Sequence, residues 1–177
     1  MSKAKSFKKR KLITGLIASR PEVFHRTEDE LQNLFGPIDT ESSFFDFNYT
    51  DYYSKQMGGV PLNRKFLSFE ELIKPERLSE IKITMNHLEN KIKKSLHSPH
   101  RIVNIDPGIL NSSSLIMATV KDFAHRIPLR DGIYGHLELL FGKNDIRNLD
   151  WTYPDFKKGI YHSFFWKVRK KYIEQLR

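Results

Sequence analysis

Polar side chains of complementary chemistry gather in the second half of the sequence. They are Asp106, Lys121, Asp122, His125 and Arg126. An aspartate beside a histidine could orient the imidazole as a general base. Lysine and arginine could hold an anionic substrate or stabilise charge that develops during a reaction. The cluster favours a polar pocket for an anionic small molecule, although it indicates neither a catalytic residue nor a cofactor.

The same residues also have a plainer explanation. Asp106 precedes Pro107-Gly108, and an aspartate in that position is typical of the start of a turn. Asp122 could cap a turn, and Lys121 and Arg126 could be ordinary charges at strand ends. The sequence leaves both interpretations open.

Two basic residues earlier in the chain, Arg64 and Lys82, are further candidates for the pocket. Lys82 shares a face of a predicted helix with Asn86, which is also typical of a solvated surface. Two aromatic-rich segments, residues 51–53 and 151–155, could wall a pocket for a planar ligand. They could equally fold their rings back onto the core.

Several familiar motifs are missing. Gly142-Lys143 is followed by Asn144, and Leu137 stands where a P-loop needs a glycine. The sequence has no Gly-x-Gly-x-x-Gly dinucleotide fingerprint and no Gly-x-Ser-x-Gly nucleophile elbow. It also has no cysteine, which excludes disulfides, thiolate nucleophiles and cysteine-ligated metals. His97 and His100 lack a third ligand nearby in sequence, so we expect no metal site.

Hydrophobic periodicity and turn residues predict the elements that position the cluster. Strands are expected over residues 12–18, 44–49, 62–69, 101–106 and 115–120, and helices over 21–35, 75–96 and 161–176. Asp131-Gly132 predicts a hairpin of residues 126–130 with 133–141. Asp106 would then end the fourth strand, and residues 121–126 would form a turn between two adjacent strands.

The predicted fold class is α+β. The segment 1–106 follows the order strand, helix, strand, strand, helix, strand, which is the split βαβ order of ferredoxin-like folds. The rest of the chain would extend the sheet by a further strand and a hairpin, and would pack a C-terminal helix on it. We expect a basic tail over residues 1–11 and a single domain over residues 12–177.

The net charge of +9 is concentrated at the two ends of the chain. Residues 1–11 carry +6 and residues 157–177 another +6, whereas residues 12–156 carry −3. Basic ends could grip phosphates, but the acidic middle disfavours nucleic acid as the partner. The longest apolar run, Leu12–Ala18, is too short to span a bilayer and precedes no signal-peptide cleavage site. We therefore expect a cytoplasmic protein without a membrane partner, of undetermined oligomeric state.

Several segments in order resemble an uncharacterised bacterial family, domain of unknown function 4416. They are residues 12–16, 34–39, 47–53, 104–108, 121–127, 131–134 and 151–155. The resemblance runs from about Lys11 to Arg177 and implies no established activity and no catalytic residues. Some members carry the label "GTP-binding protein", but Asn90-Lys91-Ile92-Lys93 lacks the acid of the guanine-reading motif. The resemblance therefore implies at most a nucleotide or phosphate ligand bound without a P-loop.

Two hypotheses from different classes follow from the sequence. The first is a pocket for an anionic small molecule, such as a nucleotide or phosphate compound, lined by the polar cluster together with Arg64 and Lys82. The alternative is an RNA-binding or protein-binding module that uses the basic termini and the C-terminal helix. An exposed patch around Trp166 would favour a protein partner.

Overall fold

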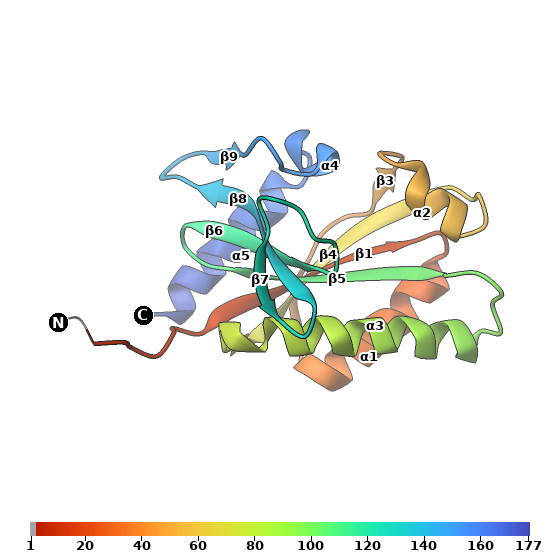
Figure 1. Ribbon diagram of the computed structural model, residues 1–177, viewed down its shortest axis with the longest axis horizontal. Coiled ribbons are helices and arrows are strands. Elements are labelled where there is room, and N and C mark those ends of the chain that lie inside the picture. The colour runs from red at the N-terminus through yellow and green to blue at the C-terminus, as the bar shows by residue number, and fades with distance from the viewer. Residues whose placement is uncertain (1–2) are drawn as a thin grey trace.

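A nine-stranded sheet is the framework of the computed structural model, which describes residues 3–177 (Figure 1). Its strands are β1 (Arg10–Ala18), β2 (Ile38–Glu41), β3 (Phe45–Phe47), β4 (Leu62–Ile73), β5 (Val103–Leu110), β6 (Ser114–Thr119), β7 (Ile127–Arg130), β8 (Ile133–Phe141) and β9 (Ile146–Asn148). The main order is β2-β4-β1-β5-β6-β8-β7, with β3 also on β4 and β9 also on β8. Every pair of neighbouring strands is antiparallel.

Helices cover both faces of this sheet. They are α1 (Pro21–Phe35), α2 (Asp51–Gln56), α3 (Leu78–Ser95) preceded by a 3-10 turn (Pro75–Arg77), α4 (Pro154–Lys157) and α5 (His162–Gln175). Helices α1 and α3 lie against one face, and α5 crosses the other (Figure 1). None of the helices within residues 3–177 is both long and apolar enough to cross a membrane.

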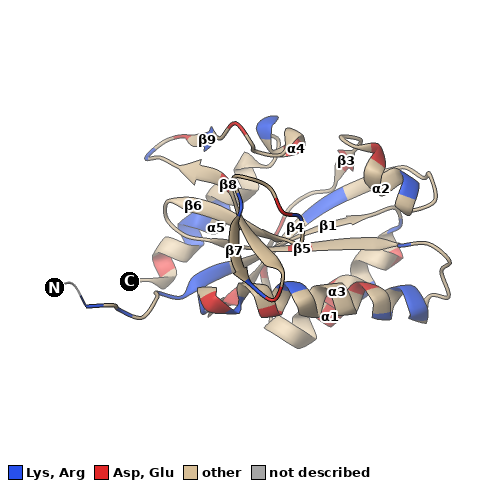
Figure 2. Cartoon of the chain, in the orientation of Figure 1, with Lys and Arg blue, Asp and Glu red and all other residues tan. Residues whose placement is uncertain are grey.

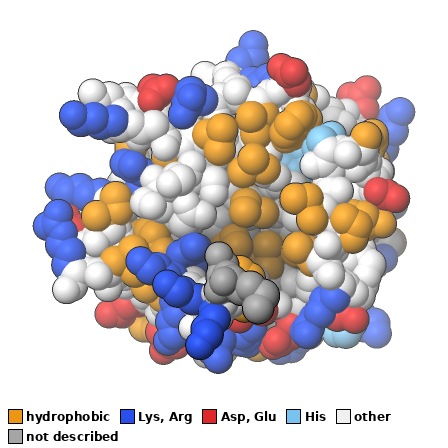
Figure 3. Space-filling model, turned by 60° about the vertical axis from the view of Figure 1, so that its left-hand side comes forward, with side chains coloured by type: hydrophobic (Ala, Val, Ile, Leu, Met, Phe, Trp, Pro, Cys, Tyr) orange, Lys and Arg blue, Asp and Glu red, His pale blue; other side chains and the backbone are white. Residues whose placement is uncertain are grey.

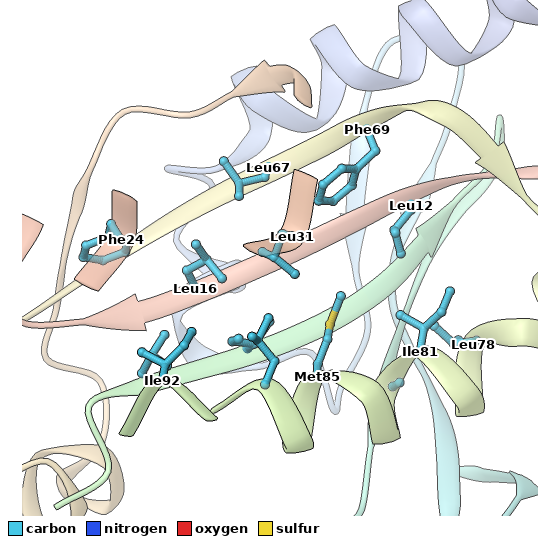
Figure 4. Close-up of a cluster of buried hydrophobic side chains, with 14 of the residues drawn as sticks. Leu12, Leu16, Phe24, Leu31, Leu67, Phe69, Leu78, Ile81, Met85 and Ile92 are labelled. Atoms are coloured by element: carbon cyan, nitrogen blue, oxygen red, sulfur yellow. The ribbon is translucent and has the colours of Figure 1, made fainter. Parts of the chain in front are cut away.

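The core under α1 and α3 follows from the alternation of side chains along the strands. Leu12 and Leu16 of β1 point to this face, where they meet Leu31 of α1 and Met85 of α3 (Figure 4). Every fourth or third residue of α3 is apolar on the buried side, so the helix lies along the sheet rather than across its end. The α1–α3 face is therefore a closed hydrophobic layer.

The opposite face of the sheet has an aromatic core. Phe66 of β4 contacts Phe156 and three residues of the C-terminal segment, Tyr161, Phe164 and Phe165, with ring centroids 4.7–5.7 Å apart. Most of these pairs meet edge to face, the arrangement that aromatic quadrupoles favour. This core covers only one end of the face, and the other end holds the cavity described below.

Strands β5 and β6 separate along part of their length, and this separation positions the cavity. Their pairing begins only at Gly108, which lies opposite Met117. Beyond it, α3 side chains replace the missing strand: Glu89 accepts the main-chain N–H of Ile105 at 2.7 Å, and Lys82 donates to the carbonyl of Ile105 at 3.0 Å. The open edge of β5 is therefore hydrogen-bonded by a helix.

The α+β class, the extended antiparallel sheet and the C-terminal helix packed on it are confirmed. The hairpin is confirmed as well, because Asp131 and Gly132 take φ values of 56° and 72° between β7 and β8. The ferredoxin-like relationship stays a prediction. The predicted end of the fourth strand at Asp106 is wrong, since β5 continues through Pro107-Gly108 to Leu110.

The predicted basic tail is shorter than expected. Arg10 and Lys11 are the first residues of β1, and the ammonium of Lys11 is fully buried, 2.5 Å from Asp39 and 2.9 Å from Gln175 of α5. Residues 3–9 form no helix or strand, and residues 1–2 of the predicted tail lie outside the described residues. Lysine and arginine are nevertheless frequent at both chain ends, as Figure 2 shows.

Candidate functional site

A cavity of about 560 Å³ lies where β5 and β6 separate, on the face that α5 leaves open. Its lining comes from strands β3, β4, β5 and β6, from helices α2, α3 and α4, and from the segment after β6. The charged residues among the lining are Arg64, Lys82, Glu89, Arg101, Asp106, Lys121 and Asp155. The aromatic ones are Phe47, Tyr49, Tyr52, Tyr53, Tyr153 and Phe156.

Asp106 is held by two neighbours at the inner end of the cavity. Its Oδ1 accepts from the ammonium of Lys82 at 2.9 Å, and its Oδ2 accepts from the side-chain amide of Asn104 at 2.6 Å. Burial alone would raise the pKa of the Asp106 carboxyl, but the charges of Lys82 and Arg64 outweigh burial and hold that pKa below its ordinary value. Asp106 is therefore an ionised hydrogen-bond acceptor rather than a proton donor.

Glu89 and Arg101 form a second pair at the same end. The carboxylate of Glu89 lies 2.6 Å from the guanidinium of Arg101 while its other oxygen accepts from Ile105. Burial raises the pKa of Glu89, and the charges of Arg101 and Lys82 offset only part of that rise. Arg101 also bonds to Asn104, so the two acidic groups of the inner end belong to one network.

Arg64 is, with Lys82, one of the two most deeply buried cations of the cavity. Its guanidinium bonds to Asp155 and lies 5.1 Å from the ring centroid of Phe47 and 5.1 Å from that of Phe66. Gly15 lies opposite Phe66 on β1, and a Cβ there would lie 3.0 Å from the Phe66 ring, so the absent side chain leaves space for the ring on which Arg64 lies. Within residues 3–177, the Nε of Arg64 is buried without a hydrogen-bond partner.

Tyrosines of α2 form a wall of the cavity. Tyr53 meets Phe47 at 5.8 Å and Tyr52 at 5.1 Å between ring centroids, in both cases edge to face. Burial raises the pKa of the Tyr53 phenol, which therefore stays protonated. Lys121 lies at the rim, with its ammonium 4.3 Å from the centroid of the Tyr52 ring.

A compact polar cluster adjoins the cavity behind Tyr153. Arg126 donates to the imidazole Nδ1 of His136 at 3.1 Å and to the phenol of Tyr153 at 2.9 Å. Because Nδ1 accepts, the proton of a neutral His136 lies on Nε2, which is 2.9 Å from the buried carboxylate of Glu138. Arg126 also donates to the main-chain carbonyl of Lys121 at 2.8 Å. Arg126 thus holds two lining residues in place without lining the cavity itself.

His125 lies on the outer side of this cluster. Its Nε2 is 3.3 Å from Nδ1 of His136, and its ring stacks on Trp151 with 5.1 Å between centroids and 9° between planes. Burial against these neighbours lowers the pKa of His125, and repulsion from Arg126 and from the protonated form of His136 lowers it further. Asp122, the expected partner of His125, is exposed and makes no ion pair with it in the described chain.

The structure brings four of the seven residues singled out from the sequence to the cavity. These are Arg64, Lys82, Asp106 and Lys121. The other three, Asp122, His125 and Arg126, lie outside the lining. The expectation that residues 121–126 turn between adjacent strands is wrong, because β6 and β7 pair with opposite edges of β8.

Sequence reasoning missed several residues of the site. Glu89 and Arg101 carry no local signal, because each reaches the cavity through contacts distant in sequence. Tyr53, in contrast, belongs to the aromatic-rich segment 51–53, which the sequence does indicate as a possible pocket wall. His136 and Glu138 did have a local signal: alternate residues of a strand share a face, so this pair could have been identified as neighbours. In the described part of the chain, no three histidine, aspartate or glutamate side chains are grouped as metal ligands would be.

The comparisons with known proteins identify a family but no relative of known function. The model of the family described as "Domain of unknown function (DUF4416)" matches residues 8–172. Neither the comparison with curated proteins nor that with solved structures gave a match. The match covers nearly the whole chain, and with it every residue of the cavity.

Proposed function

We propose that this chain, which belongs to the family described as "Domain of unknown function (DUF4416)", binds a small anionic molecule with a planar ring, such as a nucleotide. The binding site is the cavity beside Asp106. The observation that carries the proposal is the ammonium of Lys121 at the rim of this cavity, which has no carboxylate within ion-pair distance in the described part of the chain. An anionic group of a ligand in the cavity would supply the missing counter-charge.

The charge balance of the cavity supports an anion. Four basic side chains and three carboxylates line it, which gives a formal charge of +1. The pairs are Arg64–Asp155, Lys82–Asp106 and Arg101–Glu89. Lys121 is the fourth basic side chain of the lining, and no carboxylate of the described chain lies within ion-pair distance of it. A negatively charged ligand would therefore find an unneutralised cation at the rim.

The aromatic wall supports a planar group. Tyr49, Tyr52 and Tyr53 line one side of the cavity, and Tyr153 lies among the other lining residues. Aromatic rings offer large, rigid surfaces that stack well on planar ligands. The volume of about 560 Å³ is within the range of roughly 300–1,000 Å³ that small-molecule sites occupy. A ring between the tyrosines would leave its charged part near Lys121.

Thermal unfolding with a panel of ligands tests the proposal. The panel contains the adenine, guanine, cytosine and uracil nucleotides with and without magnesium, and inorganic phosphate. A ligand at about one hundred times its Kd stabilises the folded state by about 2.7 kcal/mol, which for a chain of this size raises Tm by roughly 5–10 °C. We expect such a rise with at least one nucleotide.

Two lysine variants locate the binding. Lys121→Met removes the unpaired cation and should reduce the affinity about tenfold, because a charge-assisted contact is worth about 1.5–3 kcal/mol. Lys143→Met is the matched control, since Lys143 is exposed and outside the cavity. A rise in Tm that is equal in both variants would place the ligand elsewhere, and no rise with any compound would contradict the proposal.

The alternative through the basic ends has less support. Lys11 and Lys171 are both directed to Asp39, and Arg169 donates to the carbonyl of Ser112. These basic side chains already have partners within the protein, so they are less available to bind the phosphates of RNA. Trp166 is half-buried against Phe141 rather than exposed in a patch.

A further inference from the structure

An exposed row of rings lies just outside the cavity. Phe123 and Trp151 flank His125, with centroids 6.1 Å and 5.1 Å from the imidazole and interplanar angles of 28° and 9°. Phe123 is 58% exposed and Trp151 38%. Large rings are normally covered in a folded protein, so this exposure is unusual. We call these three residues the aromatic row.

The aromatic row is held in position by contacts to the sheet. The indole N–H of Trp151 donates to the carbonyl of Leu137 in β8 at 2.9 Å. His125 contacts His136, and the Arg126 guanidinium lies 4.8 Å from the centroid of the Phe123 ring. A surface built this way loses little conformational entropy when a ligand stacks on it.

The aromatic row is joined to the wall of the cavity through His136. Tyr153 lines the cavity and stacks on His136 at 4.8 Å and 9°, and His136 meets His125 edge to face at 5.0 Å. The same guanidinium that lies on Phe123 is 5.8 Å from the Tyr153 ring. Lys121 lines the cavity and is two positions before Phe123 in the chain.

We propose that the ligand of the cavity is the end of a short single strand of nucleic acid: one nucleotide enters the cavity and the next base stacks on the aromatic row. This inference rests on the proposed function of the cavity. Successive bases need successive ring surfaces, with a cation for the phosphate that joins them. The cavity wall, Lys121 and the aromatic row supply these three features.

Charge favours nucleic acid over a protein as the occupant. Lys121 is exposed and unpaired in the described chain, and it lies two positions from Phe123. Figure 3 shows hydrophobic side chains gathered on one face of the molecule, with both basic and acidic side chains around them. A protein interface would need a larger apolar core free of a solvated cation. A nucleotide would use both the rings and the cation, because its base stacks on the rings and its phosphate pairs with Lys121.

Fluorescence anisotropy and calorimetry with defined probes test the inference. The probes are a fluorescein-labelled RNA pentamer of mixed sequence, the DNA pentamer of the same sequence, and the four nucleoside 5′-monophosphates. We expect a pentamer to bind at least about tenfold more tightly than any monophosphate, because stacking of one base is typically worth a factor of about 5 to 150. Its affinity should also fall more steeply with salt.

Two phenylalanine variants locate the extra affinity. Phe123→Ala should remove the advantage of the pentamer and leave monophosphate binding unchanged. Phe7→Ala is the matched control, because Phe7 is 64% exposed and lies among the basic residues of the N-terminal segment. Both changed side chains are exposed, and a thermal melt verifies that each variant is folded.

The outcomes separate this inference from the proposed function. If monophosphates bind and the pentamer binds no more tightly, the inference is wrong and the cavity proposal stands. If Phe7→Ala weakens the pentamer as much as Phe123→Ala does, the basic segment binds the strand and the inference is wrong. If no probe binds and Phe123→Ala instead changes the oligomeric state, the aromatic row is a protein interface. In that case both proposals are wrong.

Discussion

Replacing Lys82 by methionine should destabilise the fold strongly at neutral pH. The ammonium of Lys82 is buried, and it bonds both to the carboxylate of Asp106 and to the carbonyl of Ile105. Methionine has a similar length but cannot donate a hydrogen bond. The variant therefore leaves an ionised carboxylate and a main-chain oxygen without their common partner.

The size of the effect can be estimated from these contacts. Removing one partner of a buried ion pair typically costs about 3–5 kcal/mol of unfolding free energy. The Asp106 side chain is still 23% exposed and keeps its bond from Asn104. The expected loss is therefore near the lower end, about 3 kcal/mol. The double change Lys82→Met with Asp106→Asn removes the unpaired charge as well, and should cost only about 1–2 kcal/mol, mainly for the unpaired carbonyl of Ile105.

Urea denaturation measures both variants. With a slope of about 2 kcal/mol per molar urea, Lys82→Met should lower the midpoint by about 1.5 M at pH 7. The double variant should be more stable than the single one, so the losses of unfolding free energy from the two substitutions should not add. A single variant that loses less than about 1 kcal/mol, or a double variant that is less stable than the single one, would contradict this account of the pair.

The loss should also depend on pH in a defined direction. In the wild type the folded pKa of Asp106 is lowered, so its stabilising effect is complete above the ordinary value of 3.8 and is lost as the pH falls through the folded pKa. Without Lys82 the carboxyl can take up a proton at a higher pH. The difference between wild type and Lys82→Met should therefore shrink as the pH is lowered from neutral toward the ordinary pKa of an aspartate.

Glycine, histidine and arginine variants extend these expectations. Gly108→Ala should cost about 1–3 kcal/mol in thermal or urea unfolding, because overpacking strains a close contact. A Cβ at Gly108 would lie 2.8 Å from the main-chain oxygen of Ile116, whereas Gly135→Ala, with no neighbour closer than 3.5 Å, should cost less. In an NMR titration the midpoint of His125 should lie below its ordinary pKa of 6.5. His125 should therefore stabilise the folded state above pH 6.5 and lose this effect as the pH falls through its folded pKa. A midpoint above 6.5 would contradict this expectation. Arg126→Lys should both lower the urea midpoint and weaken nucleotide binding. The reason is that one ammonium cannot reach all three acceptors of the guanidinium. Unchanged binding would show that Arg126 does not position the cavity wall.

The apolar periodicity of the sequence was sufficient to predict the elements that bury a whole stripe or face. The run Leu12–Ala18, the amphipathic segments of α1 and α3, and the Asp131-Gly132 hairpin all appear in the structure near their predicted bounds. Short elements were missed. Helix α2 has only six residues, fewer than two helical turns, and so could show no period.

Pro107-Gly108 misled the prediction for a reason that the sheet makes clear. The main-chain groups of Ile105 point away from β1, toward α3, and those of Pro107 two positions later point the same way. Since β6 joins only at Gly108, the missing N–H of Pro107 falls where no strand needs it. A proline inside a strand is tolerated there, and the turn that the dipeptide usually indicates does not form.

The candidate site was predictable only in part. Lys82, Asp106 and Arg64 could be named as charges, but their meeting depends on the order of strands across the sheet. Asp155 belongs to an aromatic-rich segment that the sequence left between two interpretations. The pairing of Asp155 with Arg64 joins residues far apart in the chain, and nothing local to either residue indicates it.

The bond from the buried ammonium of Lys11 to Gln175 of α5 has a consequence for the order in which a newly made chain can mature. Strands β1, β4 and β5 leave the ribosome early, and α1 and α3 can cover one of their faces at once. The other face, with Phe66 at its centre, must wait for α5. Until then the nascent chain exposes an apolar surface, which is when a protein is most open to aggregation and to chaperones. The emergence of α5 from the ribosome is therefore the step that completes the packing around β1.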